Sequence, residues 1–353
     1  MQIVLVLTVC VLSGLYATGI LGALGAVLML VAVAMNVLLL LEFDNFKVKI
    51  FILLFVNIIP FSAAAVFLQS VVMALGALYP LVMAMPIWLT VKKGYGRSAS
   101  IALAAIGAML VWCISFVLSI ISELGAFNSE TLGTLLDSIF DPYVEYFLSA
   151  AGSEDGGILS QITSADIDMM RYYFKTMFFG SIGMTMIVWA YFATLATRLV
   201  AKIFGASWRL PVSYRVGFRA KLTNDGPQVE VMHERVPWRI QLDVISVGVY
   251  VAAYIIAVLF APSDGVLLTL YTVAINLILI LSPGFLYCGL RDIVLGFRRK
   301  STTGALGYIT FAVGLVMMFI SPISIVIMLC ALGVIVTVRE NRVRRNSEKI
   351  GKE

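Results

Sequence analysis

Residues 2–41 read QIVLVLTVCVLSGLYATGILGALGAVLMLVAVAMNVLLLL and contain no charged side chain. A single transmembrane helix needs about 20 apolar residues to cross a hydrocarbon core of about 30 Å, so this run is long enough for two. Glycines at positions 19, 22 and 25 offer a place where the chain can turn. The run lacks a basic n-region, so we interpret it as a retained pair of membrane helices and not as a signal peptide.

The rest of the chain has a similar composition. It is 61% hydrophobic and only 13% charged over 353 residues, which leaves too few polar side chains to cover a water-soluble globule. Its long apolar runs lack the alternation of a membrane β-barrel, and helices are the other structure that spans lipid. We therefore predict an all-α fold, a polytopic transmembrane helical bundle of about ten spans within a range of about eight to ten.

Short charged breaks separate the remaining spans. A second double-length run at 48–91 predicts two helices, with a bend at Pro60. The last run, 304–338, is predicted as two short helices that meet at Ser321-Pro322, because one helix would carry the basic C-terminal tail to the outer side. Single spans are predicted at 98–122, 172–197, 240–260 and 265–290.

One segment is strongly acidic. Between positions 123 and 170 there is no Lys or Arg, while nine residues are acidic: Glu123, Glu130, Asp137, Asp141, Glu145, Glu154, Asp155, Asp166 and Asp168. Because cytoplasmic loops are enriched in basic residues, this segment is predicted to lie outside the cytoplasm. Leu132, Leu135, Leu136, Ile139, Phe140 and Tyr143 follow helical spacing, which predicts an outer amphipathic helix with Asp137, Asp141 and Glu145 on another face.

The loop after Thr197 is basic and is therefore predicted to be cytoplasmic. Its Asn224-Asp225-Gly226-Pro227 sequence is a turn signal, and residues 228–231 alternate in the manner of a strand. A small hairpin is the structure that these signals indicate.

These patterns divide the chain into six parts. They are an N-terminal membrane bundle of about five spans (1–122), an acidic extracytoplasmic segment (123–171), a transmembrane span (172–197), a basic cytoplasmic loop (198–239), a C-terminal membrane bundle of about four spans (240–338) and a basic cytoplasmic tail (339–353). Both termini are predicted to be cytoplasmic.

Signatures of several enzyme classes are missing from the sequence. There is no G-x-x-x-x-G-K-[ST] loop, and the nearest look-alike at 296–301 lacks the second glycine. His233 is the only histidine, and four scattered cysteines offer no Cys/His cluster, so we predict no enzyme activity, no cofactor and no metal site. The formal charge of +5 collects beside membrane spans, which argues against nucleic-acid binding.

Two amides are the candidate ligand-binding residues. Asn57 and Asn276 each fall near the middle of a predicted span, where a polar group is costly unless it is satisfied or kept for function. They either contact a small polar ligand or form interhelical hydrogen bonds worth about 1 kcal/mol each. Hydrogen bonding between helices is the commoner role of such residues.

Two further pairs are predicted to lie at the membrane interface. Trp208-Arg209 and Trp238-Arg239 each place an aromatic ring beside a cation at the boundary of the basic loop. Rings and cations of this kind anchor helices at the level of the lipid headgroups. We therefore assign all four residues to anchoring.

Several segments carry a family resemblance. They are Tyr79-Pro80 through Pro86, Lys92-Lys93-Gly94-Tyr95-Gly96-Arg97, Arg235-Val236-Pro237-Trp238-Arg239, Ser282-Pro283-Gly284-Phe285-Leu286-Tyr287-Cys288-Gly289-Leu290 and a terminal hairpin ending at Leu332-Gly333. In layout they resemble the YybS-like family of uncharacterised bacterial membrane proteins, which is distantly similar to S components of energy-coupling-factor transporters. The likeness covers about two-thirds of the chain. The long acidic segment and the enlarged basic loop depart from the family pattern.

The resemblance implies a multi-pass protein of the bacterial plasma membrane. Its partners would be the lipid bilayer, a small-molecule solute, and a separate ATPase with its coupling membrane protein, in keeping with the missing P-loop. Solute binding or transport in the manner of an S component is thus the first hypothesis. The alternative is a non-transporting scaffold or regulator that recruits cytoplasmic partners through the basic loop.

Overall fold

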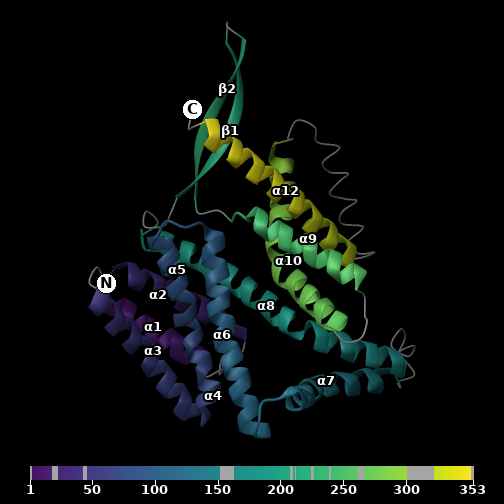
Figure 1. Ribbon diagram of the computed structural model, residues 1–353. Helices are drawn as coiled ribbons and strands as arrows, with labels where there is room; N and C mark the ends of the chain where they lie inside the picture. The colour runs from purple at the N-terminus through teal and green to yellow at the C-terminus, as the bar shows by residue number, and fades with distance from the viewer. Residues whose placement is uncertain are drawn as a thin grey trace.

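The computed structural model describes residues 2–17, 23–42, 46–151, 163–206, 210, 212–223, 226–237, 240–260, 266–299 and 322–350. Within these ranges the chain forms helices and one two-stranded antiparallel hairpin (Figure 1). The hairpin projects from one end of the helical bundle, here called the hairpin end. Helix α7 lies at the opposite end, the α7 end (Figure 1).

The N-terminal helices follow the predicted pattern. They are α1 (Gln2–Ala17), α2 (Ala23–Glu42), α3 (Phe46–Leu68), α4 (Val71–Ala74), the 3-10 helix η1 (Leu75–Leu78), α5 (Tyr79–Lys92) and α6 (Arg97–Leu124). Both double-length runs are divided, as the sequence predicts. In the second run, Gln69 has a positive φ of 51°, and the Ser70 side chain caps α4 by accepting from the Met73 amide. Pro60 lies inside α3 and does not end it.

Helix α7 (Ser129–Ala151) is the predicted amphipathic helix, and α8 (Ser164–Ile203) contains the next predicted span. At 40 residues α8 is about 60 Å long, twice the thickness of a hydrocarbon core. It begins before the predicted span because Thr163 and Asp166 form a capping box. The helix is therefore longer than a single membrane span requires.

The buried face of α7 differs in part from the predicted one. Phe140 is buried against Phe174 of α8 at 5.1 Å, but Tyr143 is 59% exposed. Asp137 instead turns toward α8, where Lys175 lies at 2.7 Å from its carboxylate. Arg171 of α8 forms a second ion pair with α7, since its guanidinium lies 3.0 Å from the Asp141 carboxylate. Cations just beyond the acidic segment thus draw the acidic side of α7 toward α8.

The hairpin consists of β1 (Val212–Thr223) and β2 (Gly226–Pro237). The predicted hairpin is confirmed by the pairing of its strands, whereas residues 224 and 225 of the predicted turn lie outside the described residues. Each strand has 12 residues and is longer than the short strand that the sequence suggested. The register pairs Val212 with Pro237 at the foot and Thr223 with Gly226 at the tip. The fold is therefore a helical bundle with a long hairpin, not purely α.

The C-terminal half comprises α9 (Val244–Leu259), α10 (Val266–Arg299) and α12 (Pro322–Ile350). Helices α10 and α12 approach closely at two glycines. A Cβ atom on Gly289 would overlap the carbonyl oxygen of Leu329, and one on Gly333 would overlap that of Phe285. Small residues allow such close backbone approach between membrane helices.

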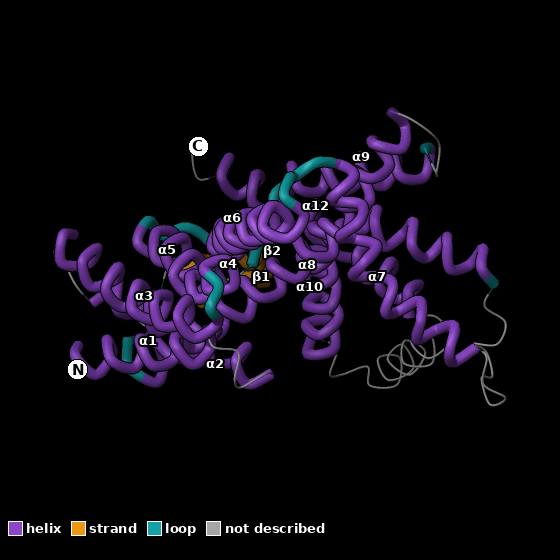
Figure 2. Tube along the Cα trace, turned by 90° about the horizontal axis from the view of Figure 1, so that it is seen from below, coloured by secondary structure: helices purple, strands orange, loops and turns teal. Residues whose placement is uncertain are grey.

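Helix α8 joins the two halves of the bundle. It packs against α2 and α6 on one side and against α10 on the other. Figure 1 shows α8 running between the N-terminal helices and the α10 and α12 pair. In Figure 2, which views the molecule from below, α1, α3 and α5 lie on one side and α7 and α9 on the other. Residues from α8 therefore take part in both halves of the protein.

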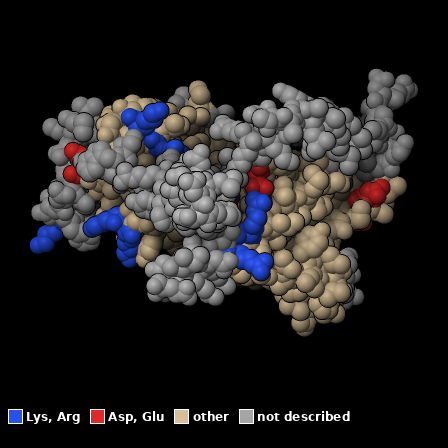
Figure 3. All heavy atoms as spheres, turned by 90° about the horizontal axis from the view of Figure 1, so that it is seen from above, with Lys and Arg blue, Asp and Glu red and all other residues tan. Residues whose placement is uncertain are grey.

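The hairpin end is the basic end of the molecule. Figure 3 looks onto this end and shows lysine and arginine side chains in several patches across it, together with fewer acidic side chains. Helices α5, α6 and α8 each have a basic residue at or next to the helix end there, at Lys92, Arg97 and Lys202. Arg291 of α10 bonds the Ile240 carbonyl just after the hairpin. Acidic α7 lies at the other end.

Seven helices within the described ranges are long and apolar enough to cross a membrane. Helix α9 is apolar too but has only 16 residues, because Asp243 caps it and residues 240–243 stay outside it. A helix begins at Pro322, where the two helices of the last apolar run were predicted to meet. The first of those two predicted helices lies outside the described residues. The count of about ten spans stays a prediction.

Candidate functional site

A cavity of about 350 Å³ lies inside the N-terminal half of the bundle. Four helices line it: α1, α2, α5 and α8. The lining residues are Tyr16, Gly25, Ala26, Met29, Tyr79, Met83, Met186 and Trp189. A volume of this size is in the range of small-molecule sites, which are mostly apolar with a few placed polar groups.

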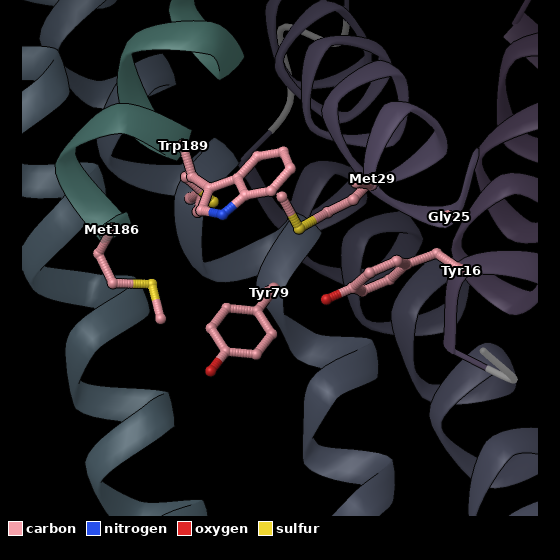
Figure 4. Close-up of a pocket in the computed structure, with 8 residues that line it drawn as sticks. Tyr16, Gly25, Met29, Tyr79, Met186 and Trp189 are labelled. Carbon is pink, nitrogen blue, oxygen red and sulfur yellow. The ribbon is translucent and has the colours of Figure 1, made fainter. Parts of the chain in front are cut away.

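The lining combines aromatic rings, methionines and a few hydrogen-bonding groups. In Figure 4 the Tyr16 hydroxyl and the Trp189 indole nitrogen point toward the space between the labelled side chains, whereas the Tyr79 hydroxyl points away from it. Methionine is flexible and polarisable, so Met29 and Met186 can adapt to a guest. The indole N–H donates only, whereas a phenol can donate or accept.

Among the described residues that line the cavity, none carries a formal charge. An isolated ion moved into an apolar surrounding loses tens of kcal/mol of solvation in the idealised limit, so it needs a counter-ion. The cavity is therefore suited to an uncharged molecule that has a hydrogen-bond acceptor for the Trp189 N–H and an apolar body for the rings and thioethers. Covalent chemistry has no evident nucleophile or base within this lining.

The predicted ligand residue Asn57 lies elsewhere, between α2 and α3. It is fully buried and donates to the Asn36 side-chain oxygen at 3.4 Å and to the Leu53 carbonyl at 2.8 Å. Asn36 in turn donates to the Ala32 carbonyl at 3.0 Å. Asn57 is not among the cavity residues, and its contacts are those of the interhelical alternative.

Replacing Asn57 by leucine is expected to cost about 1 kcal/mol of unfolding free energy, because Asn36 loses an interhelical partner. Replacing both asparagines by leucine is expected to recover part of this loss, since neither amide is then left unpaired. Unfolding by denaturing detergent in mixed micelles measures both values. The role of Asn57 would be different from packing if N57L kept its stability but lost a co-purifying solute.

Asn276 joins α10 to α8. Its amide donates to the Thr176 and Thr272 carbonyls, each at 2.7 Å, and its oxygen accepts from the Gly180 amide. A Cβ atom on Gly180 would overlap Asn276, so the glycine is what allows this contact. Asn276 thus also makes interhelical bonds and is absent from the cavity lining.

The four predicted interface residues, Trp208, Arg209, Trp238 and Arg239, lie outside the described residues. Their anchoring role stays a prediction. Arg97, the last residue of the basic segment 92–97, is buried although it carries a charge. It is the first residue of α6 and is only 4% exposed.

Arg97 belongs to a polar layer on the hairpin side of the cavity helices. Its Nε donates to Thr194 Oγ1 at 2.9 Å, and its guanidinium lies 4.8 Å from the centre of the Tyr191 ring. Thr90 and Ser100, both buried, share a hydrogen bond of 2.5 Å in the same helices, α5 and α6. This layer ties α5, α6 and α8 together where the basic end begins.

The foot of the hairpin is also fixed to the bundle. Three side chains bond the backbone of residues 240–242, which follow β2: Ser98 of α6, Arg291 of α10 at 3.1 Å and Asn341 of α12 at 3.0 Å. Arg291 is itself held by Glu340 of α12 at 2.7 Å. Three helices thus fix the segment from which β2 leaves the bundle.

Within the described residues, no three His, Cys, Asp or Glu side chains lie together as a metal site would require. Comparison of the chain with models of known protein families, with curated proteins and with solved structures finds no match. The resemblance to YybS-like proteins therefore stays a prediction, and the function has to be inferred from the site itself.

Proposed function

We propose that this chain is a multi-pass membrane protein that binds a small uncharged solute inside its helical bundle, as the first step of uptake in the manner of an S component. The cavity among α1, α2, α5 and α8 is the observation that carries this proposal. It offers a partly open, adaptable aromatic lining with an N–H donor directed into it (Figure 4). Solute sites within bundles have this character.

The charge distribution supports an orientation for the protein. Basic residues at the hairpin end match the positive-inside rule, so this end, with the C-terminal tail, faces the cytoplasm in the proposal. The acidic α7 then lies on the outer side. A bacterial plasma membrane is the compartment that the resemblance to YybS-like proteins implies.

The proposal includes a separate energy source. The sequence contains no P-loop, so net uptake against a gradient would need an ATPase and a coupling membrane protein from outside this chain. Binding alone needs neither. The two steps can therefore be tested independently.

The binding step is tested with three probes of one shape: benzamide, benzoate and benzylammonium. Because the lining has no charge, the purified full chain is expected to bind benzamide at least about tenfold more tightly than either ion. Saturation-transfer NMR in nanodiscs measures the three affinities. Mass spectrometry of the extracted protein shows whether a natural uncharged solute is retained.

Tighter binding of either ion than of benzamide would contradict the assignment to uncharged solutes. An absence of all binding, together with no retained molecule, would remove solute binding as the function. Leu290 on α10 is 51% exposed and is not among the lining residues, so L290F serves as a control that adds volume outside the cavity.

A specific observation supports recruitment of cytoplasmic partners as a second candidate function. The hairpin within the basic loop projects beyond the bundle (Figure 1), and its foot is fixed to three helices. A scaffold would use this segment, so replacing residues 212–237 by a short Gly-Ser linker is expected to release bound partner proteins while solute retention is kept. Co-purification followed by mass spectrometry distinguishes the two outcomes.

A further inference from the structure

Two of the helices that line the cavity continue from it toward the hairpin end. Met83 and Trp189 are lining residues of α5 and α8. Thr90 lies farther along α5 by about 10 Å, and Thr194 lies farther along α8 by about 8 Å. Both threonines belong to the polar layer that also contains Arg97. This layer therefore lies between the cavity and the hairpin end.

The described side chains between the cavity and the polar layer are closely packed. On α5, Ala84 and Ile87 have no exposed surface, and on α8 the same is true of Ala190 and Ala193. All four belong to the main hydrophobic core, together with Val33 of α2. Protein cores leave few voids larger than a water molecule. These residues therefore block the passage of a solute toward the hairpin end.

Helix α6 holds the two cavity helices together at the level of the polar layer. Its Ser100 shares a hydrogen bond with Thr90 of α5. Its Arg97 donates to the Thr194 hydroxyl of α8 at 2.9 Å and to the Tyr191 carbonyl at 3.3 Å. Side chains three residues apart are neighbours on a helix surface, so Arg97 and Ser100 share one face of α6. Helices α5 and α8 each pack more extensively against α6 than against each other.

A charged side chain is a costly way to close this path. Arg97 is buried, and its partners among the described residues are a hydroxyl, a carbonyl and an aromatic ring, with no carboxylate. Apolar side chains of similar volume would fill the same space without the desolvation cost of a cation. Water that reached the guanidinium would restore its solvation, so separation of α6 from α8 costs less here than in an apolar core.

We propose that the polar layer is the closure of the cavity toward the hairpin end, and that it opens when Arg97 releases Thr194 and Tyr191 of α8. The inference rests on the proposed function, because it takes the cavity as the solute site. Trp189 and Thr194 lie on the same helix, so a movement of α8 away from Arg97 also moves the cavity lining. Arg97 and Thr194 are positioning residues, since neither is among the lining residues.

Substitutions at Thr194 separate the hydrogen bond from the packing. Thr194→Val keeps the shape of the side chain but leaves Arg97 Nε without its acceptor, whereas Thr194→Ser keeps the hydroxyl. Thr197→Val is the matched control. Thr197 is also fully buried on α8, and its hydroxyl donates to the Ala193 carbonyl of the same helix, so its loss breaks no bond between helices among the described residues.

A single cysteine in the cavity reports on access from each side of the membrane. The four natural cysteines are replaced by alanine, and Ala26→Cys places a thiol in the lining. A methanethiosulfonate that carries glucose is uncharged and does not cross lipid. It is added to right-side-out or inverted vesicles from cells that express the full chain. A separate variant, Lys202→Cys, is exposed at the hairpin end and identifies the vesicles in which this end faces the reagent.

Thr194→Val is expected to raise the rate of modification of Ala26→Cys from the hairpin side at least about tenfold, because a charge-assisted hydrogen bond of the closed arrangement is lost. Thr194→Ser and Thr197→Val are expected to react as the parent does. An unchanged rate in Thr194→Val, or an equal rise in either of the other two variants, would overturn the proposal. A rise of the same size from both sides of the membrane would indicate general loosening of the bundle and would overturn it as well.

Benzamide distinguishes failure of this inference from failure of the proposed function. The thiol reaction needs no solute, so it reports on the closure even when benzamide does not bind. Protection of Ala26→Cys by benzamide, with no effect of Thr194→Val, would keep the solute site and remove the closure. An effect of Thr194→Val without benzamide binding would support the closure and contradict the assignment of the cavity to uncharged solutes.

Discussion

Replacing Ala26 by phenylalanine is expected to weaken benzamide binding at least about tenfold, which corresponds to about 1.4 kcal/mol. Ala26 lines the cavity from α2, so an added ring occupies space that the solute needs. The change leaves the Tyr16 hydroxyl and the Trp189 indole in place. Saturation-transfer NMR and the amount of natural solute retained after purification measure the loss.

The neighbouring residue supplies the control. Val27 is 55% exposed on the outer side of the same helix, so V27F adds a comparable ring without filling the cavity. It is expected to bind benzamide as the parent does. Equal binding of benzamide by A26F and the parent would show that the solute lies elsewhere. The comparison with V27F is direct, because both substitutions lie on α2 and differ only in the face of the helix that receives the ring.

Trp189→Phe tests the polar half of the same site. The indole N–H points into the cavity, and phenylalanine keeps an aromatic ring but removes the donor (Figure 4). The affinity for benzamide is expected to fall about fivefold, near the 1 kcal/mol of a neutral hydrogen bond, while binding of toluene, which has no acceptor, is expected to change little. The two probes thus separate the donor from the ring.

The helix pattern was accessible to sequence reasoning because each element depends on local residues. Uninterrupted apolar runs set the helices, and the helix that begins at Pro322 follows from a proline that favours the first turn of a helix. The turn of the hairpin was also predicted from residues 224–227. Its strands are longer than predicted, because apolar residues alternate along the whole of 212–223 and not only at 228–231.

The cavity could not be predicted in the same way. Tyr16, Tyr79 and Trp189 come from three helices, and no spacing in the sequence relates them. They meet only because the helices pack at particular depths and rotations. Asn57 illustrates the same limit, since its partner Asn36 lies on another helix and became evident only from the packing.

The sequence predicted which segments are acidic and which are basic, but not which residues each charged side chain contacts. The acidic segment was placed opposite the basic loops, and the two do lie at opposite ends of the bundle (Figure 1). Arg97 ends the basic segment at 92–97, yet Thr194 and the Tyr191 ring, 97 and 94 residues away in sequence, hold it in the interior. Long-range contacts of this kind decide burial.

Gly333→Leu is expected to separate α12 from α10 and to cost about 3 kcal/mol or more of unfolding free energy. Even a Cβ atom at this position would overlap the Phe285 carbonyl oxygen, and that atom belongs to backbone, which cannot rotate away. Cys330 and Cys288 are 2% and 1% exposed in the same pair of helices. With Cys10 and Cys113 replaced by serine, the maleimide labelling of Cys288 and Cys330 is expected to accelerate at least tenfold.

Ala331→Leu is the matched control, because it enlarges α12 two residues away on the exposed side of the helix. Its labelling rate is expected to equal that of the parent. If G333L kept both cysteines protected, α10 and α12 would have to tolerate a wider separation than the glycine contacts allow. The close approach of these helices would then not be required for the fold. The same two helices supply Arg291 and Asn341, which bond the backbone of residues 240 and 242, so a fixed position of this segment would no longer follow from the helix contact.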